Sequence, residues 1–222
     1  MESWTNDYPH DILAIDCEMV GVGRNGKQSI LARVSIVDYY GNVLLDEYVK
    51  PTEEVTDYRT EITGITPEKI ENGECFEDVR AKVLQVIKNC VLVGHAIQND
   101  LEVLKLDHPK HKIRDTQQFP EFQECLQRKK PSLKDLVRIY LRKEIHAGEH
   151  DSVQDAKLTL LLYRIAINDM ELFADNIGDH NDNIDDFLYK IFNKLNSYDD
   201  DDADLSWEDP GWESTWWLCD SD

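Results

Sequence analysis

Residues 11–20, DILAIDCEMV, form a run in which apolar and β-branched side chains occupy most positions. The run ends at a group of glycines, and this pattern is typical of a buried strand followed by a loop. Because successive side chains of a strand point to opposite faces, Asp16 and Glu18 share one face of the predicted sheet. The other face takes the apolar members of the run, Leu13, Ile15, Cys17 and Met19.

Further apolar runs and helical stripes alternate along the chain. Strands are expected at 30–40, 43–51, 91–96 and 112–116, the first two forming a hairpin through Gly41-Asn42. Helices are expected from Pro67, over 76–89, over about 99–106, over about 132–141, and from Ser152 onward. This order predicts an α/β fold with a mixed sheet of about five strands flanked by helices.

The character of the chain changes near residue 170. Residues 171–222 hold 16 acidic residues against two lysines, whereas residues 1–170 carry a net charge of −7. We therefore expect one domain over residues 1–170 and an acidic C-terminal extension, helical at about 184–195 and then disordered. The extension also carries tryptophans. It suits either a solubilising tail or a segment that imitates nucleic acid and binds the substrate groove or a partner protein.

Composition excludes several classes of protein. No apolar run reaches the roughly 18–20 residues that a membrane helix needs, and the N-terminus has no secretory signal. The five cysteines form no CxxC pair and no zinc spacing, as expected in a reducing intracellular compartment. The net charge of −21 argues against a non-catalytic module that binds duplex DNA through a broad basic face. We expect a soluble intracellular protein with no membrane segment.

Acidic residues recur where predicted strands end and predicted helices begin. Asp100 follows the strand that ends at Gly94, and Asp155 lies five residues after His150. Positions five apart on a helix differ by about 140° in direction, so we expect His150 on the loop before the helix and Asp155 in its first turn. Asp155 then lies where the helix dipole favours an ionised carboxylate.

Each of these residues also has a purely structural interpretation. A solvated pair explains Asp16 and Glu18, and a helix cap explains Asp100 or its neighbour Asn99. Ser152 and Asp155 fit the pattern of a helix start. His95 is interpreted as a hydrogen-bonded histidine behind the site.

Taken together, the acidic residues suit one chemistry. Hydrolysis of a phosphodiester is promoted by two divalent ions roughly 4 Å apart, one activating water and the other stabilising the departing oxygen. Mg²⁺ and Mn²⁺ prefer oxygen ligands, whereas zinc sites favour cysteine and histidine. A histidine whose pKa is near neutrality can accept the proton of the attacking water. Four carboxylates and one histidine therefore predict a site for two divalent cations.

The same residues resemble the signature of a known family. Asp16-x-Glu18, Asp100 and His150-x4-Asp155 are similar, in type and order, to the DEDDh exonucleases of the ribonuclease H-like superfamily. The phrases DCEMVGVG, YRTEITGIT, VGHAIQNDL, RDT, PSLKDL and EHDSVQDA resemble the eukaryotic RNA exonuclease group. That group includes the interferon-stimulated 20 kDa exonuclease and the small ribosomal-RNA-processing exonucleases. The resemblance covers about residues 11–167, so residues 1–170 are interpreted as the exonuclease domain.

The resemblance implies a role for each signature residue. Asp16 would bridge two cations, either Mg²⁺ or Mn²⁺, and Glu18 and Asp155 would complete one metal site. Asp100 would support the second ion, and His150 would be the general base. Such an enzyme removes 5′-mononucleotides one at a time from the 3′ end of single-stranded RNA.

Two further residues match substrate contacts of the family. Met19 matches a residue that packs against the terminal ribose, and Arg59 matches a loop arginine near the terminal nucleotide. Their structural alternatives are a core methionine and a solvated loop charge.

Two other functions stay open. One is a 3′–5′ DNA exonuclease of repair type, and the other is an interaction protein that uses its acidic tail. The resemblance favours the nucleus or nucleolus over the cytoplasm.

Overall fold

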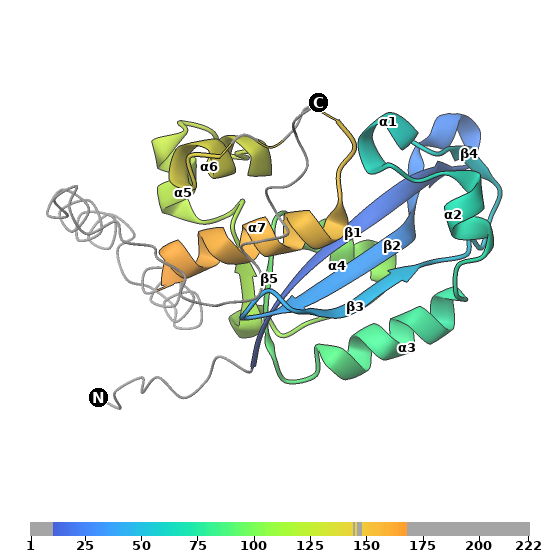
Figure 1. Cartoon of the computed structure of the whole chain (residues 1–222), viewed down its shortest axis with the longest axis horizontal. Coiled ribbons are helices and arrows are strands. Elements are labelled where there is room, and N and C mark those ends of the chain that lie inside the picture. The colour runs from blue at the N-terminus through green and yellow to red at the C-terminus, as the bar shows by residue number, and fades with distance from the viewer. Residues whose placement is uncertain (1–10, 144, 146–147, 168–222) are drawn as a thin grey trace, which may run out of the picture. The chain divides into compact units, whose positions relative to one another are not determined.

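The computed structural model describes residues 11–143, 145 and 148–167 (Figure 1). The acidic extension over 171–222 and the helix expected at 184–195 lie outside the described residues. Within the described part, no helix combines the length and the apolar character that crossing a bilayer demands.

A mixed sheet of six strands forms the centre of the described part. Its strands are β1 Ile12–Val22, β2 Gln28–Asp38, β3 Val43–Tyr48, β4 Val55–Asp57, β5 Val91–Gly94 and β6 Ile113–Asp115. The order is β3-β2-β1-β5-β6, and β4 pairs with the end of β1. The hairpin part is antiparallel, whereas β5 and β6 run parallel to their neighbours. The mixed sheet is confirmed, and β4 makes it one strand larger than expected.

The first strand continues past the expected end at Val20 to Val22. Gly21 permits this because a Cβ at that position would lie 2.5 Å from the carbonyl oxygen of Gly26. The close approach folds residues 24–26 back onto β1, and β4 pairs with the same end of the strand.

Seven α-helices surround the sheet within the described residues: α1 Thr60–Thr63, α2 Pro67–Glu71, α3 Phe76–Val86, α4 Gln98–Leu104, α5 Pro120–Cys125, α6 Leu133–Tyr140 and α7 Ser152–Ile165. The helices expected from Pro67, over 76–89, over 99–106, over 132–141 and from Ser152 are confirmed, with some ends shorter. The short helices α1 and α5 were not expected.

Two layers of helices cover the two faces of the sheet (Figure 1). Helices α3 and α4 pack on the face that carries Leu13, Ile15 and Cys17 of β1. Helix α7, with α5 and α6, packs on the face that carries Ala14 of β1 and Val37 of β2. The predicted alternation along β1 is therefore confirmed, and it leaves Asp16 and Glu18 on the α7 face.

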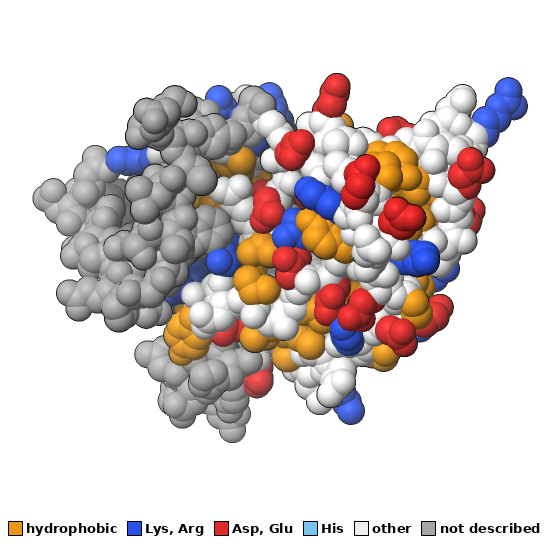
Figure 2. All heavy atoms as spheres, turned by 45° about the vertical axis from the view of Figure 1, so that its right-hand side comes forward, with side chains coloured by type: hydrophobic (Ala, Val, Ile, Leu, Met, Phe, Trp, Pro, Cys, Tyr) orange, Lys and Arg blue, Asp and Glu red, His pale blue; other side chains and the backbone are white. Residues whose placement is uncertain are grey.

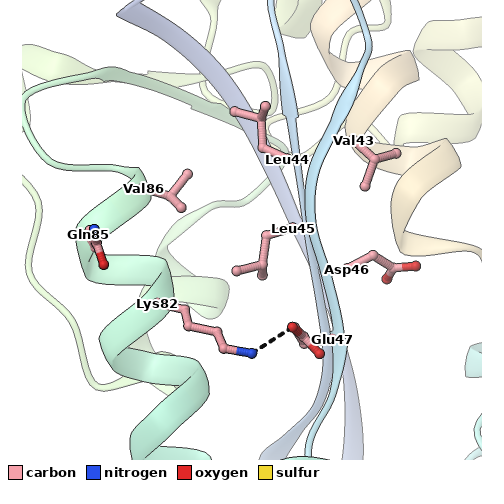
Figure 3. Close-up of a pocket in the computed structure, with 8 residues that line it drawn as sticks. All are labelled: Val43, Leu44, Leu45, Asp46, Glu47, Lys82, Gln85 and Val86. Carbon is pink, nitrogen blue, oxygen red and sulfur yellow. Dashed lines mark hydrogen bonds and ion pairs between the residues drawn. The ribbon is translucent and has the colours of Figure 1, made fainter.

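The surface of the described part is mixed in character. On the face shown in Figure 2, acidic, basic and apolar side chains are interspersed. A hollow of about 610 Å³ lies at the sheet edge, between β3 and α3 (Figure 3). Lys82 of α3 crosses this hollow and donates to Glu47 of β3 at 2.8 Å. None of the predicted site residues lines this hollow.

Candidate active site

Three carboxylates meet between the sheet and the first turn of α7. Asp16 and Glu18 come from the middle of β1, and Asp155 comes from α7. One oxygen of each lies within 4.8 Å of an oxygen of the other two. Glu18 and Asp155 are each 5% exposed. Residues almost 140 positions apart in sequence are thus brought into one acidic cluster.

The fourth predicted acid, Asp100, lies beside this cluster. Asp100 is buried in the first turn of α4 and, with Asp16, lines a cavity of about 420 Å³. Met19, Ser29 and His95 line the same cavity. The cavity therefore joins the strand that carries the first two acids to the helix that carries Asp100.

The electrostatics of the cluster are unfavourable without a cation. Burial, then the charges of Asp100, Asp155 and Glu18, hold the pKa of Asp16 well above its usual range. Burial and Asp155 raise the pKa of Glu18 to about 7, against the opposing effects of His150 and Arg33. Burial also raises the pKa of Asp100. Like charges confined in a poorly solvated space repel each other, and a nearby cation would reverse these shifts.

The donor set fits a hard divalent cation. The buried Oε1 atom of Glu18 has no hydrogen-bond partner among the described residues. A buried carboxylate oxygen without a donor is costly, so it points to a ligand that the protein itself does not supply. Oxygen donors alone suit Mg²⁺ or Mn²⁺ better than zinc.

His150 lies on the loop before α7, as expected. Its Nδ1 atom is 2.9 Å from Oδ2 of Asp155, and its backbone N–H donates to the carbonyl of Ile62 at 2.6 Å. The hydrogen bond with Asp155 raises the pKa of His150, against the effect of partial burial. The side chain of His150 is 57% exposed, so the ring is open to solvent. The hydrogen bond with Asp155 fixes the ring beside the acidic cluster.

The predicted cap of α7 needs a correction, although the helix begins at Ser152 as expected. Asp151, not Ser152, caps the helix, since its side chain accepts a hydrogen bond from the backbone N–H of Gln154 at 2.9 Å. The hydroxyl of Ser152 is instead buried 2.6 Å from the hydroxyl of Ser35. Asp155 is therefore not needed as part of the cap, and its carboxylate is available to the cluster.

The structural alternative for Asp100 is also wrong. Helix α4 begins after Ile97 and has no side-chain cap among the described residues. His95 matches its interpretation, because its Nδ1 atom lies 2.9 Å from the hydroxyl of Thr116. Its ring nevertheless lines the cavity of Asp16 and Asp100.

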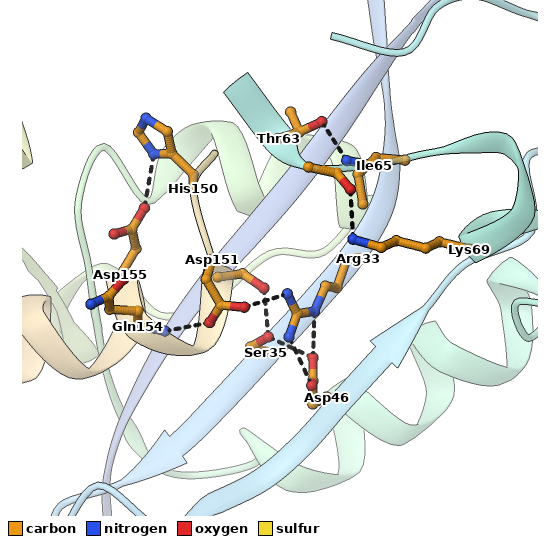
Figure 4. Close-up of polar contacts among 12 residues, drawn as sticks. Arg33, Ser35, Asp46, Thr63, Ile65, Lys69, His150, Asp151, Gln154 and Asp155 are labelled. Atoms are coloured by element: carbon orange, nitrogen blue, oxygen red, sulfur yellow. Dashed lines mark hydrogen bonds and ion pairs between the residues drawn. The ribbon is translucent and has the colours of Figure 1, made fainter. Parts of the chain in front are cut away.

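Arg33 organises a polar network that the sequence pattern did not predict (Figure 4). It lies opposite Glu18 in the pairing of β1 with β2. Its guanidinium donates to Asp46 of β3 at 2.7 and 2.9 Å and to Asp151 at 2.8 Å. Ser35 also donates to Asp46 at 2.9 Å. We call Arg33, Asp46 and Asp151 the Arg33 clamp, and it ties the capping residue of α7 to the sheet.

Part of the Arg33 clamp is indicated by the sequence. Arg33 and Ser35 are polar residues two apart in an otherwise apolar strand, so they share a face. A polar pair on a buried face calls for buried partners. Asp46 lies opposite Ser35 in the predicted hairpin. Asp151 is reached only through the packing of α7 across the sheet, which no local pattern reveals.

Met19 and Arg59 occupy different positions relative to the cavity. Met19 lines the cavity beside Asp16 and also packs against the core under α3 and α4. Arg59 has a left-handed backbone, with φ of 53°. Its guanidinium donates to the hydroxyl of Ser29 at 3.0 Å and to the carbonyl of Gly26 at 2.9 Å. Arg59 is thus an anchored side chain, and Ser29 is its link to the cavity wall.

Comparison with known proteins agrees with this geometry. A family model described as Exonuclease matches residues 13–163. RNA exonuclease 4 of Xenopus tropicalis is 53% identical over 151 residues, which is 68% of this chain and 36% of that protein. RNA exonuclease 4 of Saccharomyces cerevisiae is 48% identical over 153 residues, which is 68% of this chain and 53% of that protein. The chain thus matches roughly a third to a half of the length of these two relatives.

Solved structures with the same fold include Pan2 nucleases. The apo pseudoubiquitin hydrolase-RNA exonuclease module of Saccharomyces cerevisiae Pan2 has a TM-score of 0.65 at 27% identity, covering 85% of this chain and 31% of that one. The same module in complex with AAUUAA RNA has a TM-score of 0.64 at 26% identity, covering 86% and 33%. The predicted ribonuclease H-like fold is confirmed, and the chain belongs to the exonuclease family.

Proposed function

We propose that this chain is a metal-dependent 3′–5′ exoribonuclease that removes 5′-mononucleotides from single-stranded RNA. The observation that carries the proposal is the cluster of Asp16, Glu18 and Asp155 within 4.8 Å, beside the cavity of Asp100. RNA as the substrate class is supported by the relatives named RNA exonuclease 4 and by the Pan2 module solved with RNA.

The four carboxylates would hold two divalent cations, either Mg²⁺ or Mn²⁺. Asp16 would bind both ions, Glu18 and Asp155 would complete one site, and Asp100 would support the other. When bound, such ions supply positive charge to an attacking water and to the departing oxygen of the phosphodiester. The buried Oε1 of Glu18, which lacks a donor among the described residues, supports this assignment.

His150 would act as the general base. If Nδ1 donates its proton to Oδ2 of Asp155, Nε2 carries the free lone pair. The exposed ring then presents Nε2 to the water that attacks the phosphate. Asp155 orients the ring in the same way that a carboxylate orients a catalytic histidine in other hydrolases.

Met19 and Arg59 would recognise the terminal nucleotide. Met19 is in the cavity wall, where an apolar side chain suits the face of a ribose. Arg59 would act partly through Ser29, whose hydroxyl it binds at 3.0 Å. A hydroxyl in the wall offers one way to sense the 2′-hydroxyl that distinguishes RNA from DNA.

The test is a degradation ladder on single-stranded RNA labelled at its 5′ end, with a matched DNA strand in parallel. With Mg²⁺ or Mn²⁺ the RNA should shorten stepwise from its 3′ end, and a chelator should stop the reaction. His150→Ala should slow it by about 10²–10⁴-fold while metal binding is retained. Faster degradation of the DNA strand would favour the repair-type alternative. Intact RNA in the presence of either metal would refute the proposal.

A further inference from the structure

Basic residues gather in one stretch of the domain. Residues 128–143 hold seven arginines and lysines against a single acid, Asp135. The other residues between 11 and 167 together carry a net charge of −10. The stretch comprises the loop after α5 and all of α6. A concentration of positive charge in an acidic chain suggests a place for an anionic ligand.

The loop before α6 is linked by hydrogen bonds to a segment that packs against His95 in the wall of the candidate site's cavity. The side-chain amide of Gln117 donates to the carbonyl of Pro131 at 3.5 Å. Thr116 precedes Gln117, and its hydroxyl oxygen lies 2.9 Å from Nδ1 of His95. His95 in turn lines the cavity together with Asp16. The loop is also held in place from α5, because Gln123 donates to the carbonyl of Lys129 at 2.8 Å.

Helix α6 continues from this loop toward the proposed general base. Leu136 and Val137 of α6 pack in the same apolar core as α7. Lys134 lies in the first turn of α6, near enough to His150 for the two side chains to interact electrostatically. The loop and the first turn of α6 thus lie along one side of the candidate site.

Three lysines along this side of the site are exposed, and no acidic residue that the structure describes neutralises their charge. Lys129, Lys130 and Lys134 are exposed and form no ion pair with any residue that the structure describes. Arg128 and Arg138, in contrast, pair with Asp135 at 2.6 and 3.3 Å. We call Lys129, Lys130 and Lys134 the rim lysines.

We propose that the rim lysines bind phosphates of the RNA strand on the 5′ side of the nucleotide being removed. The inference rests on the proposed function. An enzyme that takes the 3′-terminal nucleotide into its cavity leaves the rest of the RNA strand outside. In this proposal, that part of the strand passes over the rim lysines. Three ammonium groups can each pair with one of a few consecutive phosphates. The long, flexible side chains of lysine can adjust to the different conformations of a single strand. Binding of upstream phosphates favours longer substrates over dinucleotides.

The experiment replaces the rim lysines together, as Lys129→Gln, Lys130→Gln and Lys134→Gln in the full chain. A matched control removes three exposed lysines elsewhere, as Lys88→Gln, Lys105→Gln and Lys110→Gln. Lys88 and Lys110 precede β5 and β6, at the ends of those strands opposite to His95. Both variants change the net charge by the same amount, so a general electrostatic effect alters them equally.

The measurements are the KM for a dinucleotide and for a longer single-stranded RNA, together with the dissociation constant for the longer RNA at several salt concentrations. In the rim variant the KM for the longer RNA should rise about tenfold more than the KM for the dinucleotide. The slope of log affinity against log salt should fall by about 0.7 for each phosphate that the variant no longer binds. The control variant should keep both values.

Each outcome separates the two proposals. Equal weakening in the two variants, or unchanged affinity and KM in the rim variant, would overturn the rim proposal. Because RNA binding is measured directly, the result stands even for a protein that does not cleave. Rim-dependent binding without cleavage by the wild type would support the rim and overturn the proposed function alone.

Discussion

The two faces of the sheet are built from the same strands and differ in what they hold. On the α3 face, β1 places Leu13, Ile15 and Cys17 in an apolar core. On the α7 face, the same strand places Asp16 and Glu18 against a helix that brings a third carboxylate. Both faces bury apolar side chains, but only the α7 face also gathers carboxylates that repel each other. The contrast indicates that the α7 face, near the helix start, is shaped for binding at the expense of stability.

Strand β3 shows the same contrast within two neighbouring residues. Asp46 points to the α7 face and accepts the hydrogen bonds of Arg33 (Figure 4). Glu47 faces the α3 side and pairs with Lys82 (Figure 3). Lys82 also pairs with Glu74 at 2.6 Å. The side chain of Arg33 is 11% exposed and that of Lys82 is 42% exposed. Ion pairs of similar length therefore differ in solvation, and we expect them to differ in effect.

The largest effect is expected for Asp16→Asn on the α7 face. Activity should fall by about 1000-fold or more, because a carboxylate that would bind both cations is replaced by a neutral amide. Stability in the absence of metal should rise near neutral pH, because the folded wild type must hold a proton on Asp16 that the unfolded chain releases, and an amide carries no such cost. Single-turnover cleavage and denaturant unfolding measure the two effects. A decrease in both activity and stability would contradict the idea that the carboxylates on the α7 face reduce the stability of the metal-free protein.

The second prediction concerns pH in the absence of metal. The pKa of Glu18 is raised from 4.5 to about 7, so the folded state holds this proton over a range in which the unfolded state has released it. Stability should therefore be highest below about pH 4.5 with respect to this group, and should fall by about 2–3 kcal/mol as pH rises toward 7. The raised pKa values of Asp16 and Asp100 act in the same direction.

Thermal unfolding across this pH range, with chelator or with excess Mg²⁺, tests the second prediction. Excess Mg²⁺ should raise the unfolding temperature most near neutral pH, where the carboxylates are ionised. Glu18→Gln should flatten the dependence measured with chelator. A stability of the metal-free protein that increases between pH 4.5 and 7 would show that the cluster is not strained.

The third prediction concerns the difference between the Arg33 clamp and the ion pairs of Lys82. Arg33→Ala should reduce stability by about 2 kcal/mol, less than for a fully buried pair because Asp46 and Asp151 are partly exposed. It should also lower kcat by about tenfold or more, with a smaller change in KM, because Asp151 and the start of α7 are no longer tied to the sheet. Arg33→Lys should restore only part of the rate, since an ammonium does not span both carboxylates in the same way.

Lys82→Ala is the matched control, because it also removes two ion pairs, one of them with Glu47 on the other side of β3. It should leave kcat unchanged. An equal decrease of kcat in the two variants would mean that the Arg33 clamp acts through general stability alone, and not by positioning Asp155 and His150.

The sequence was informative where a residue's role follows from local pattern. The period of two in β1 was enough to place Asp16 and Glu18 on one face. The spacing of His150 and Asp155 was enough to place one on the loop and the other in the first turn. The cap of α7 was predicted one residue too late, because Asp151 and Ser152 are both good capping residues and only the packing decides between them.

Other features depend on interactions that no local pattern contains. Strand β4 is three residues long and lies against Gly26, where a Cβ would be 2.5 Å from the Cβ of Asp57. Arg33 meets Asp151, a residue 118 positions away, only because α7 crosses the sheet at that point. Arg59 resembles a solvated loop charge in sequence, yet the loop geometry directs it onto Ser29 and Gly26.

The smallest effect is expected on the α3 face, for Val83→Ala. Val83 is fully buried among apolar side chains, so its truncation should destabilise the fold by about 1–2 kcal/mol through reduced burial and a small cavity. Its neighbour Leu84 is 50% exposed, and Leu84→Ala should destabilise much less despite removing a larger group. Neither variant should change kcat measured well below the unfolding temperature, because α3 packs on the opposite face of the sheet from the acidic cluster. A decrease of kcat in folded Val83→Ala would show that the two faces are coupled through the sheet, and that the apolar face also sets the geometry of the carboxylates.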